Sequence, residues 1–260
     1  MPERVLALEG VHNFRDCGGY PVSGGGRMRR GVTWRSGQHH GATDADLVQI
    51  EALGLTHVFD LRTSVERARR PCRRPQGFSG TVFFAEDPQR LSAPHLAAAQ
   101  TTRQRTPDSM RESLTRNYGT IGFRPELQGP IRQYLTAVAQ GEGASLINCM
   151  AGKDRTGFAV AMLHEALGVH RDDILEDYLL TNTAGDVEAR IASGAATIVE
   201  ITGETDPAVI RVLMGVEPEY LQTAWAAIEE RYGSVEAYME QELGVDAALK
   251  ERLRAALVEG

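Results

Sequence analysis

Cys149 and Arg155 lie six positions apart in a segment that reads SLINCMAGKDRTGFAVAMLHEAL. A cysteine thiolate is a strong nucleophile, and a helix N-terminus and nearby cations favour this ionised form. The planar guanidinium of an arginine matches two oxygens of a phosphate group. The pair therefore predicts covalent phosphoryl transfer through a phosphocysteine, in a metal-independent phosphomonoesterase that needs no cofactor.

The residues around this pair predict a strand, a tight loop and a helix. Leu146 and Ile147 form a short apolar run before the loop, and apolar residues at helical spacing follow it. Such a loop directs backbone N–H groups and the helix dipole at one small volume, which suits an anion. In such a loop, glycines allow the backbone to approach the ligand closely, and a lysine adds positive charge. A threonine hydroxyl can donate a hydrogen bond to the cysteine sulfur. The predicted phosphate-binding residues of the loop are Met150, Ala151, Gly152, Lys153, Thr156 and Gly157.

Other kinds of site fit the loop less well. Of the three cysteines, only Cys149 has an arginine six positions later. A nucleotide-binding P-loop would need Ser or Thr after Lys153 and a glycine in place of Ile147. The remaining alternative is a buried structural cysteine beside a charged surface run.

The segment from Asn148 to Gly157 resembles the HCxxGxxRTG signature of cysteine-dependent protein tyrosine phosphatases. Its AGKDRTG form is similar to a bacterial branch that includes mycobacterial and Listeria phosphatases of tyrosine, serine and phosphoinositides. The resemblance implies an α/β fold, with a central, mostly parallel sheet flanked by helices. Asn148 replaces the family's histidine, which helps to hold the loop and the thiolate. We therefore expect a slower or differently tuned enzyme.

Three further motifs resemble the same branch. VHNFRDCGGY is similar to its N-terminal element, which implies that Asn13 and Arg15 pack near the loop. GVTWRSG and FDLRTSVER are similar to strands that end beside it. Arg35 then either lines the pocket or lies exposed on an edge strand, and Arg62 is expected to touch substrate.

Two acidic residues and a second cysteine are candidates for supporting roles. A carboxylic acid must protonate the leaving oxygen and then activate water. Asp154 is the first candidate because the Lys-Asp-Arg form of the loop places it at the pocket, and Asp87 is the alternative. Cys17 stands where the family usually has an aliphatic residue. We hypothesise that it forms a reversible protective disulfide with Cys149.

The rest of the chain predicts one catalytic domain over residues 1–260. A capped helix at Asp44–Leu53 followed by a strand at Leu55–Leu61 implies a parallel sheet. Residues 86–124 show no clear period and are expected to form a lid or insert. Residues 183–260 are expected to form a helical C-terminal part. Two further helices are predicted at Met110–Tyr118 and Gly129–Ala139.

The composition of the chain limits the kinds of partner and the cellular setting that can be expected. The 28 basic and 35 acidic residues of the 260-residue chain give a net charge of −7, which argues against general nucleic-acid binding. No apolar run approaches the ~18 residues of a membrane span. Three cysteines without pairing or metal spacing favour a reducing, cytoplasmic setting, although non-classical secretion stays open. The oligomeric state is left open.

The natural phosphate ester also stays open. Phosphotyrosine or phosphoserine proteins and phosphoinositides are the first expectation, and a small metabolite is the alternative. A weak phospho-binding module and a sulfur-transfer or arsenate-reducing enzyme are further alternatives. The basic run from Arg67 to Arg74 is either a solvated face or an attractor for a polyanionic substrate such as an inositol phospholipid head group.

Overall fold

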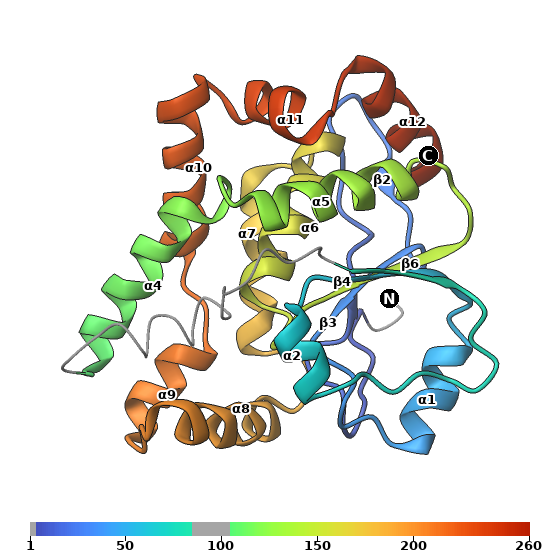
Figure 1. Cartoon of the computed structure of the whole chain (residues 1–260). Helices are drawn as coiled ribbons and strands as arrows, with labels where there is room; N and C mark the ends of the chain where they lie inside the picture. The colour runs from blue at the N-terminus through green and yellow to red at the C-terminus, as the bar shows by residue number, and fades with distance from the viewer. Residues whose placement is uncertain (1–3, 85–104) are drawn as a thin grey trace.

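The computed structural model describes residues 4–84 and 105–260. Within these residues, the centre is a five-stranded sheet in the order β1-β3-β6-β4-β5 (Figure 1). β1 is antiparallel to β3, whereas the other pairs are parallel. The predicted α/β fold with a mostly parallel sheet is confirmed. The strands are β1 (Arg15–Asp16), β3 (Thr33–Ser36), β4 (Leu55–Asp60), β5 (Thr81–Phe84) and β6 (Ala144–Asn148).

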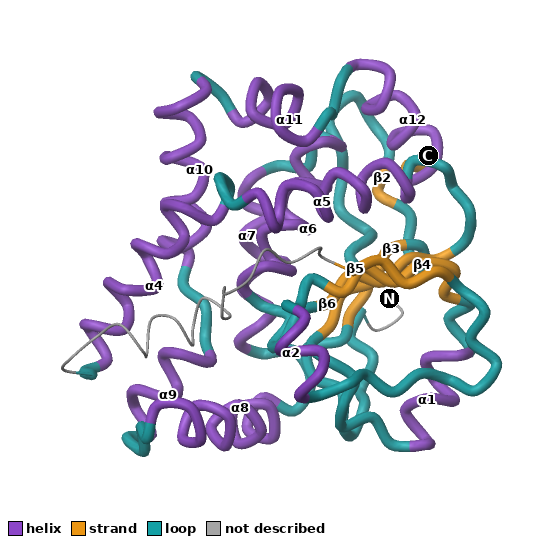
Figure 2. The backbone as a smooth tube through the Cα atoms, viewed as in Figure 1, coloured by secondary structure: helices purple, strands orange, loops and turns teal. Residues whose placement is uncertain are grey.

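Both faces of the sheet are covered, as expected for parallel strands (Figure 2). Side chains alternate along β6, so Leu146 and Ile147 enter different clusters. Leu146 belongs to the cluster that includes Ile50 of helix α1 (Asp44–Glu51). Ile147 belongs to the larger cluster, which includes side chains of α5 (Pro125–Val138) and α6 (Asp154–Leu167).

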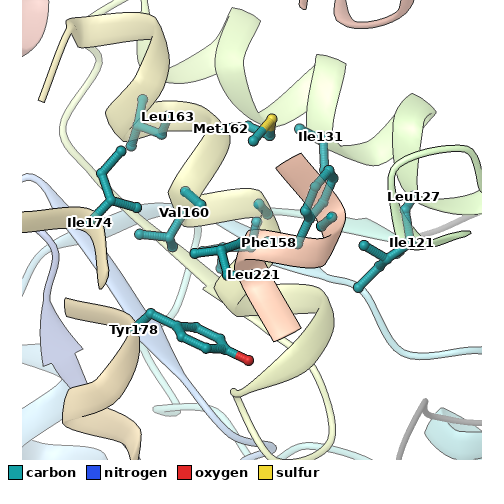
Figure 3. Packing of buried hydrophobic residues seen from close by; sticks show 14 of the residues in the cluster. Ile121, Leu127, Ile131, Phe158, Val160, Met162, Leu163, Ile174, Tyr178 and Leu221 are labelled. Atoms are coloured by element: carbon teal, nitrogen blue, oxygen red, sulfur yellow. The ribbon is translucent and has the colours of Figure 1, made fainter. Parts of the chain in front are cut away.

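Helix α6 lies at the centre of the larger cluster. All of its residues except Glu165 are buried. Its apolar side chains pack against residues of α5, of α7 (Arg171–Leu179) and of α10 (Pro218–Tyr232) (Figure 3). Helices α11 (Val235–Leu243) and α12 (Ala247–Leu257) also contact α6. The helix is thus held from several sides, which fixes the position of its N-terminus.

The remaining elements surround this centre. None of the described helices is long and apolar enough to cross a membrane. Helix α4 packs on α10 and α9, α8 packs on α9, and strands β2 and β7 pair as a separate small sheet. The elements not yet bounded are α2 (Ser64–Arg69), α4 (Pro107–Ile121), the 3-10 turn η1 (Leu180–Asn182), α8 (Val187–Thr202), α9 (Pro207–Met214), β2 (Arg27–Met28) and β7 (Val258–Glu259).

Helix boundaries differ in places from the sequence prediction. The helix at Asp44 is confirmed, with a capping box between Thr43 and Asp46. The prediction that a helix starts at Gly129 was wrong, because α5 already begins at Pro125 and contains Pro130. Pro125 occupies the first turn, where its missing N–H costs no intrahelical hydrogen bond. Burial of Leu127 within that turn extends the apolar face of the helix towards its N-terminus.

The proposed lid over 86–124 is described only in part. Residues 85–104 lie outside the described part of the chain, and Asp87 is among them. The next residues form α4, which is longer than the predicted helix and carries a capping box at Thr106. Its buried side chains pack on α10.

Candidate active site

The signature loop leaves the sheet at its centre. β6 ends at Asn148 between β3 and β4, and α6 begins at Asp154, so Cys149 starts the connecting loop. The whole Cys149 residue is 3% exposed. Gly152 has a φ of +66°, and a Cβ there would lie 2.4 Å from the carbonyl carbon of Ser36. The loop therefore needs glycine for both its conformation and its close contact with the end of β3.

Arg155 is held by a carboxylate from helix α2. Its two Nη atoms donate to the Glu66 carboxylate at 2.7 and 2.9 Å, and Nη1 also donates to the Leu61 carbonyl at 2.9 Å. Burial opposes the charged form, but Glu66 and Cys149 raise the pKa of Arg155 above its usual value. The guanidinium therefore stays charged and fixed in orientation. Its buried Nε has no hydrogen-bond partner among the described residues.

A buried network supports the carbonyl side of the loop. Asn13 Nδ2 donates to the Gly152 carbonyl at 2.7 Å, and Arg35 Nη2 donates to the same oxygen at 3.0 Å. Asn13 adopts the left-handed region with a φ of +61°, which asparagine tolerates better than most residues. Its Oδ1 accepts a hydrogen bond from Arg15. Asn13 and Arg35 thus fix the backbone of the loop through its Gly152 carbonyl, and Arg15 fixes Asn13.

Asp177 of α7 neutralises the two arginines of this network. Arg35 Nη1 lies 2.6 Å from Asp177 Oδ2, and Arg15 Nε lies 3.3 Å from Oδ1. Burial would raise the pKa of Asp177, but Arg15 and Arg35 together hold it below its usual value. Burial lowers the pKa of Arg15 to about 10. The network therefore carries two positive charges and one negative charge directly behind the loop.

A further ion pair, between Arg62 and Asp60, lies on the other side of β6. Arg62 Nε and Nη2 donate to the Asp60 carboxylate at 2.9 and 2.7 Å. Nη1 of Arg62 donates to the carbonyl of Arg70 at 2.6 Å. Asn148, which replaces the family histidine, donates from Nδ2 to Asp60 Oδ1 at 3.3 Å. The amide therefore still links the strand end to the neighbouring strand, without adding a charge.

The side chains of Lys153 and Asp154 contact residues from the helices that follow and precede the loop in the chain. Lys153 reaches Gly215 after α9, and Asp154 reaches Tyr118 of α4. Lys153 is fully buried, and its Nζ donates to the Gly215 carbonyl at 3.0 Å and lies 3.3 Å from Asp154 Oδ1. Burial lowers the pKa of Lys153. Tyr118 of α4 donates from its hydroxyl to Asp154 Oδ1 at 2.9 Å, and the Tyr178 hydroxyl donates to Tyr118 at 2.7 Å. The carboxylate of Asp154 is therefore oriented by two side chains, Tyr118 and Lys153, and Tyr178 in turn holds Tyr118.

The structure brings nearly all predicted site residues to this one end of the sheet. Thr156 and Gly157 lie in the first turn of α6, where the Thr156 hydroxyl is buried without a hydrogen-bond partner among the described residues. Arg35 is buried rather than exposed. Sequence reasoning missed four supporting residues. For Glu66 a signal existed, because it completes a capping box with Thr63. The other three are Asp177, Tyr118 and Tyr178, which have no distinctive local pattern.

The position of Cys17 does not fit the hypothesised disulfide with Cys149. Cys17 N donates to the Thr33 carbonyl, and Thr33 pairs with Ser145 at the start of β6. Cys149 follows the end of that strand, and four residues of strand span roughly 13 Å. The Cα atoms of a disulfide lie only about 4.4–6.8 Å apart. All three cysteines are free, and burial raises the pKa of the Cys17 thiol.

Comparison with known proteins covers almost the whole chain. The profile of the tyrosine phosphatase family matches residues 6–259. A candidate tyrosine-protein phosphatase of Cupriavidus necator is 34% identical over 94% of this chain and 85% of its own length. The triple specificity protein phosphatase PtpB of Mycobacterium tuberculosis is 32% identical over 98% of this chain and 99% of its own length. A tyrosine-protein phosphatase of Nostoc commune is 28% identical over 83% of this chain and 70% of its own length.

Proposed function

Since this chain belongs to the tyrosine phosphatase family and is a phosphatase, we propose that it hydrolyses phosphate monoesters through a phosphocysteine at Cys149. The observation that carries the proposal is the paired hydrogen bond between Glu66 and Arg155. It fixes a charged guanidinium at the same helix N-terminus that receives the loop of Cys149. A phosphate oxyanion is the ligand that such donors suit.

The first step transfers the phosphoryl group to sulfur. The Cys149 thiolate attacks phosphorus in line with the ester oxygen, an S–P bond forms and the P–O bond to the leaving group breaks. Arg155 and the amides of Met150, Ala151 and Gly152 bind the equatorial oxygens, where charge develops in the transition state. The buried Thr156 hydroxyl is available to donate to the sulfur.

Asp154 supplies and removes the proton. In its protonated form it gives the proton to the leaving oxygen. As a carboxylate it then takes a proton from water, whose oxygen attacks phosphorus while the S–P bond breaks and the thiolate is restored. Tyr118 and Lys153 orient the carboxylate for both steps. Asp87, the alternative acid, lies outside the described residues.

Three variants and a chelator test this mechanism. We expect Cys149→Ser to abolish hydrolysis of a small aryl phosphate, because an alcohol is not ionised at neutral pH. Asp154→Asn should reduce kcat by about 10²–10⁴-fold, the usual contribution of a general acid or base. Asp87→Asn should reduce it far less. Equal, small losses from both aspartates would place the acid elsewhere, and loss of activity on adding a chelator would contradict a metal-independent reaction.

We further propose that the substrates are phosphotyrosine or phosphoserine proteins or phosphoinositides. The support is the similarity to PtpB, whose name describes triple specificity. A panel of phosphotyrosine and phosphoserine peptides, inositol phosphates and sugar phosphates tests this class by kcat/KM. The highest kcat/KM on a sugar or nucleoside phosphate would instead identify the chain as a metabolite phosphatase.

A further inference from the structure

A cavity of about 110 Å³ lies beside the catalytic loop. Met150 and Ala151, which directly follow Cys149, form part of its wall. Gln38 lines it from the segment after β3, and Ser193 and Thr197 line it from helix α8. Since one water needs roughly 10–15 Å³ of such space, the cavity has room for several waters or for a phosphate group.

The lining of this cavity is cationic. None of the described residues that line it is an aspartate or glutamate, although the chain as a whole carries a net charge of −7. Arg70 and Arg190 contribute positive charge, and His12 and His40 can donate hydrogen bonds. Arg70 is only loosely paired, since its Nη2 lies 3.7 Å from Glu200 Oε2. The cavity therefore suits an anion.

Arg190 is a buried cation that forms no direct ion pair with a described carboxylate, although the charge of Asp154 favours its charged form from beyond ion-pair distance. The residue is 2% exposed, and its Nη1 donates to the Met214 carbonyl at 2.5 Å. Its Nε has no hydrogen-bond partner, and no carboxylate of the described residues forms an ion pair with it. The other buried arginines each have a carboxylate partner: Arg15 and Arg35 with Asp177, Arg62 with Asp60, and Arg155 with Glu66.

An unpaired buried guanidinium is costly unless something compensates its charge. Burial lowers the pKa of Arg190 only to about 10, so the side chain is cationic at neutral pH. Lys153 does not serve as the cation of this cavity, because its Nζ is buried against Gly215 and Asp154. Asp154 compensates this charge only from beyond ion-pair distance, so an anionic ligand that reaches Arg190 from the catalytic loop would supply the first counter-charge in direct contact with it.

We propose that this cavity is a second anion subsite, in which Arg190 binds a second phosphate carried by the same substrate molecule as the scissile ester. The subsite deepens the proposed function and rests on it. The preferred substrates are then compounds with two neighbouring phosphates. Two neighbouring phosphates occur both in a soluble inositol phosphate and in the head group of an inositol phospholipid.

The test compares kcat/KM for a vicinal inositol bisphosphate and for an inositol monophosphate, in wild type and in Arg190→Met. We expect the wild type to prefer the bisphosphate, and Arg190→Met to reduce that ratio by about 10–100-fold, as for one charge-assisted hydrogen-bonded contact. Arg211→Met is the matched control. It removes the same charge from neighbouring helix α9, where Arg211 is exposed and pairs with Glu188, and should keep the ratio. The same ratio measured with phosphoinositides in vesicles separates the lipid from the free head group.

A binding measurement separates failure of the subsite from failure of the proposed function. In Cys149→Ser protein, the inositol bisphosphate should raise Tm more than the monophosphate, and Arg190→Met should remove the difference. An unchanged ratio and an unchanged Tm difference in folded Arg190→Met would overturn the subsite and leave the phosphatase mechanism standing. Full activity of Cys149→Ser would overturn the mechanism, while the Tm difference would still report on the subsite.

Discussion

Buried arginines on two sides of the catalytic loop differ in whether a carboxylate pairs with them. Behind the loop, Arg15 and Arg35 share Asp177 and hold the loop directly or through Asn13. Beside the loop, Arg190 lines a cavity and forms no ion pair with a carboxylate of the described residues. The paired arginines stabilise a conformation, whereas the unpaired one keeps its charge available for a ligand. Proximity to a phosphate site alone therefore does not tell which arginine binds phosphate.

Asp177→Asn removes the carboxylate partner of Arg15 and Arg35, so that they lack an ion pair as Arg190 does. Of the changes considered, it should have the largest effect, which is on stability. Removal of the carboxylate leaves Arg15 and Arg35 as uncompensated buried cations. We expect the free energy of unfolding to fall by about 3–5 kcal/mol, measured by urea denaturation. Glu188→Gln, which breaks the exposed pair with Arg211, is the control and should leave stability nearly unchanged. A small loss for Asp177→Asn would show that the network does not need its counter-ion.

Glu66→Gln removes the carboxylate that orients Arg155. The guanidinium would keep its bond to the Leu61 carbonyl but lose the paired contact that fixes its plane. A displacement of about 1 Å can cost about 10²-fold in rate, so we expect kcat to fall by about 10–100-fold. Steady-state kinetics on an aryl phosphate measures the change. Unaltered kcat would mean that Arg155 is positioned by the loop alone.

The pH dependence of stability should report on the same network. The folded-state pKa of Asp177 is held below its unfolded value, so its stabilisation is present above the unfolded pKa of about 4 and fades as the pH falls. The difference in unfolding free energy between wild type and Asp177→Asn should be constant between about pH 5 and 8 and shrink below about pH 4. A difference that grows towards acid pH would contradict this charge assignment.

Tyr118→Phe should have the smallest effect of the four. It removes one hydrogen bond to Asp154 and leaves the Tyr178 hydroxyl without its acceptor. We expect a loss of about 1–3 kcal/mol in stability and a change in the pH profile of kcat, because the carboxylate loses one of its orienting groups. Tyr20→Phe is a matched control, since that buried hydroxyl has no partner among the described residues. Identical pH profiles for wild type and Tyr118→Phe would remove Tyr118 from the acid–base step.

The sequence predicted those parts of the fold and site whose residues lie close together in the chain. The strand, loop and helix around Cys149 could be predicted because apolar spacing, glycines and Arg155 lie within a few residues of one another. The parallel sheet followed from a helix that precedes a buried strand. Arg35 was expected either to line the pocket or to lie exposed on an edge strand, and its burial rules out the second alternative.

Partners that are distant in sequence could not be predicted in the same way. Asp177 lies 162 residues from Arg15 and 142 from Arg35, and it sits among other acidic residues of an amphipathic helix. Nothing in that helix shows which carboxylate is buried. The hypothesis on Cys17 failed for a related reason. Residue type suggests a disulfide, but only strand register shows that Cys17 lies level with the opposite end of β6 from Cys149.

The order of the strands in the sheet also has a consequence for biosynthesis. β6 lies between β3 and β4 but follows both of them, and β5, in the chain. While the ribosome is still adding residues before Ala144, the facing edges of β3 and β4 have no strand to fill the space between them. Unpaired edges of this kind invite wrong pairing and aggregation. The strand that leads into Cys149 is thus also the one that closes the sheet, so a nascent chain gains its signature loop only as this exposed gap disappears.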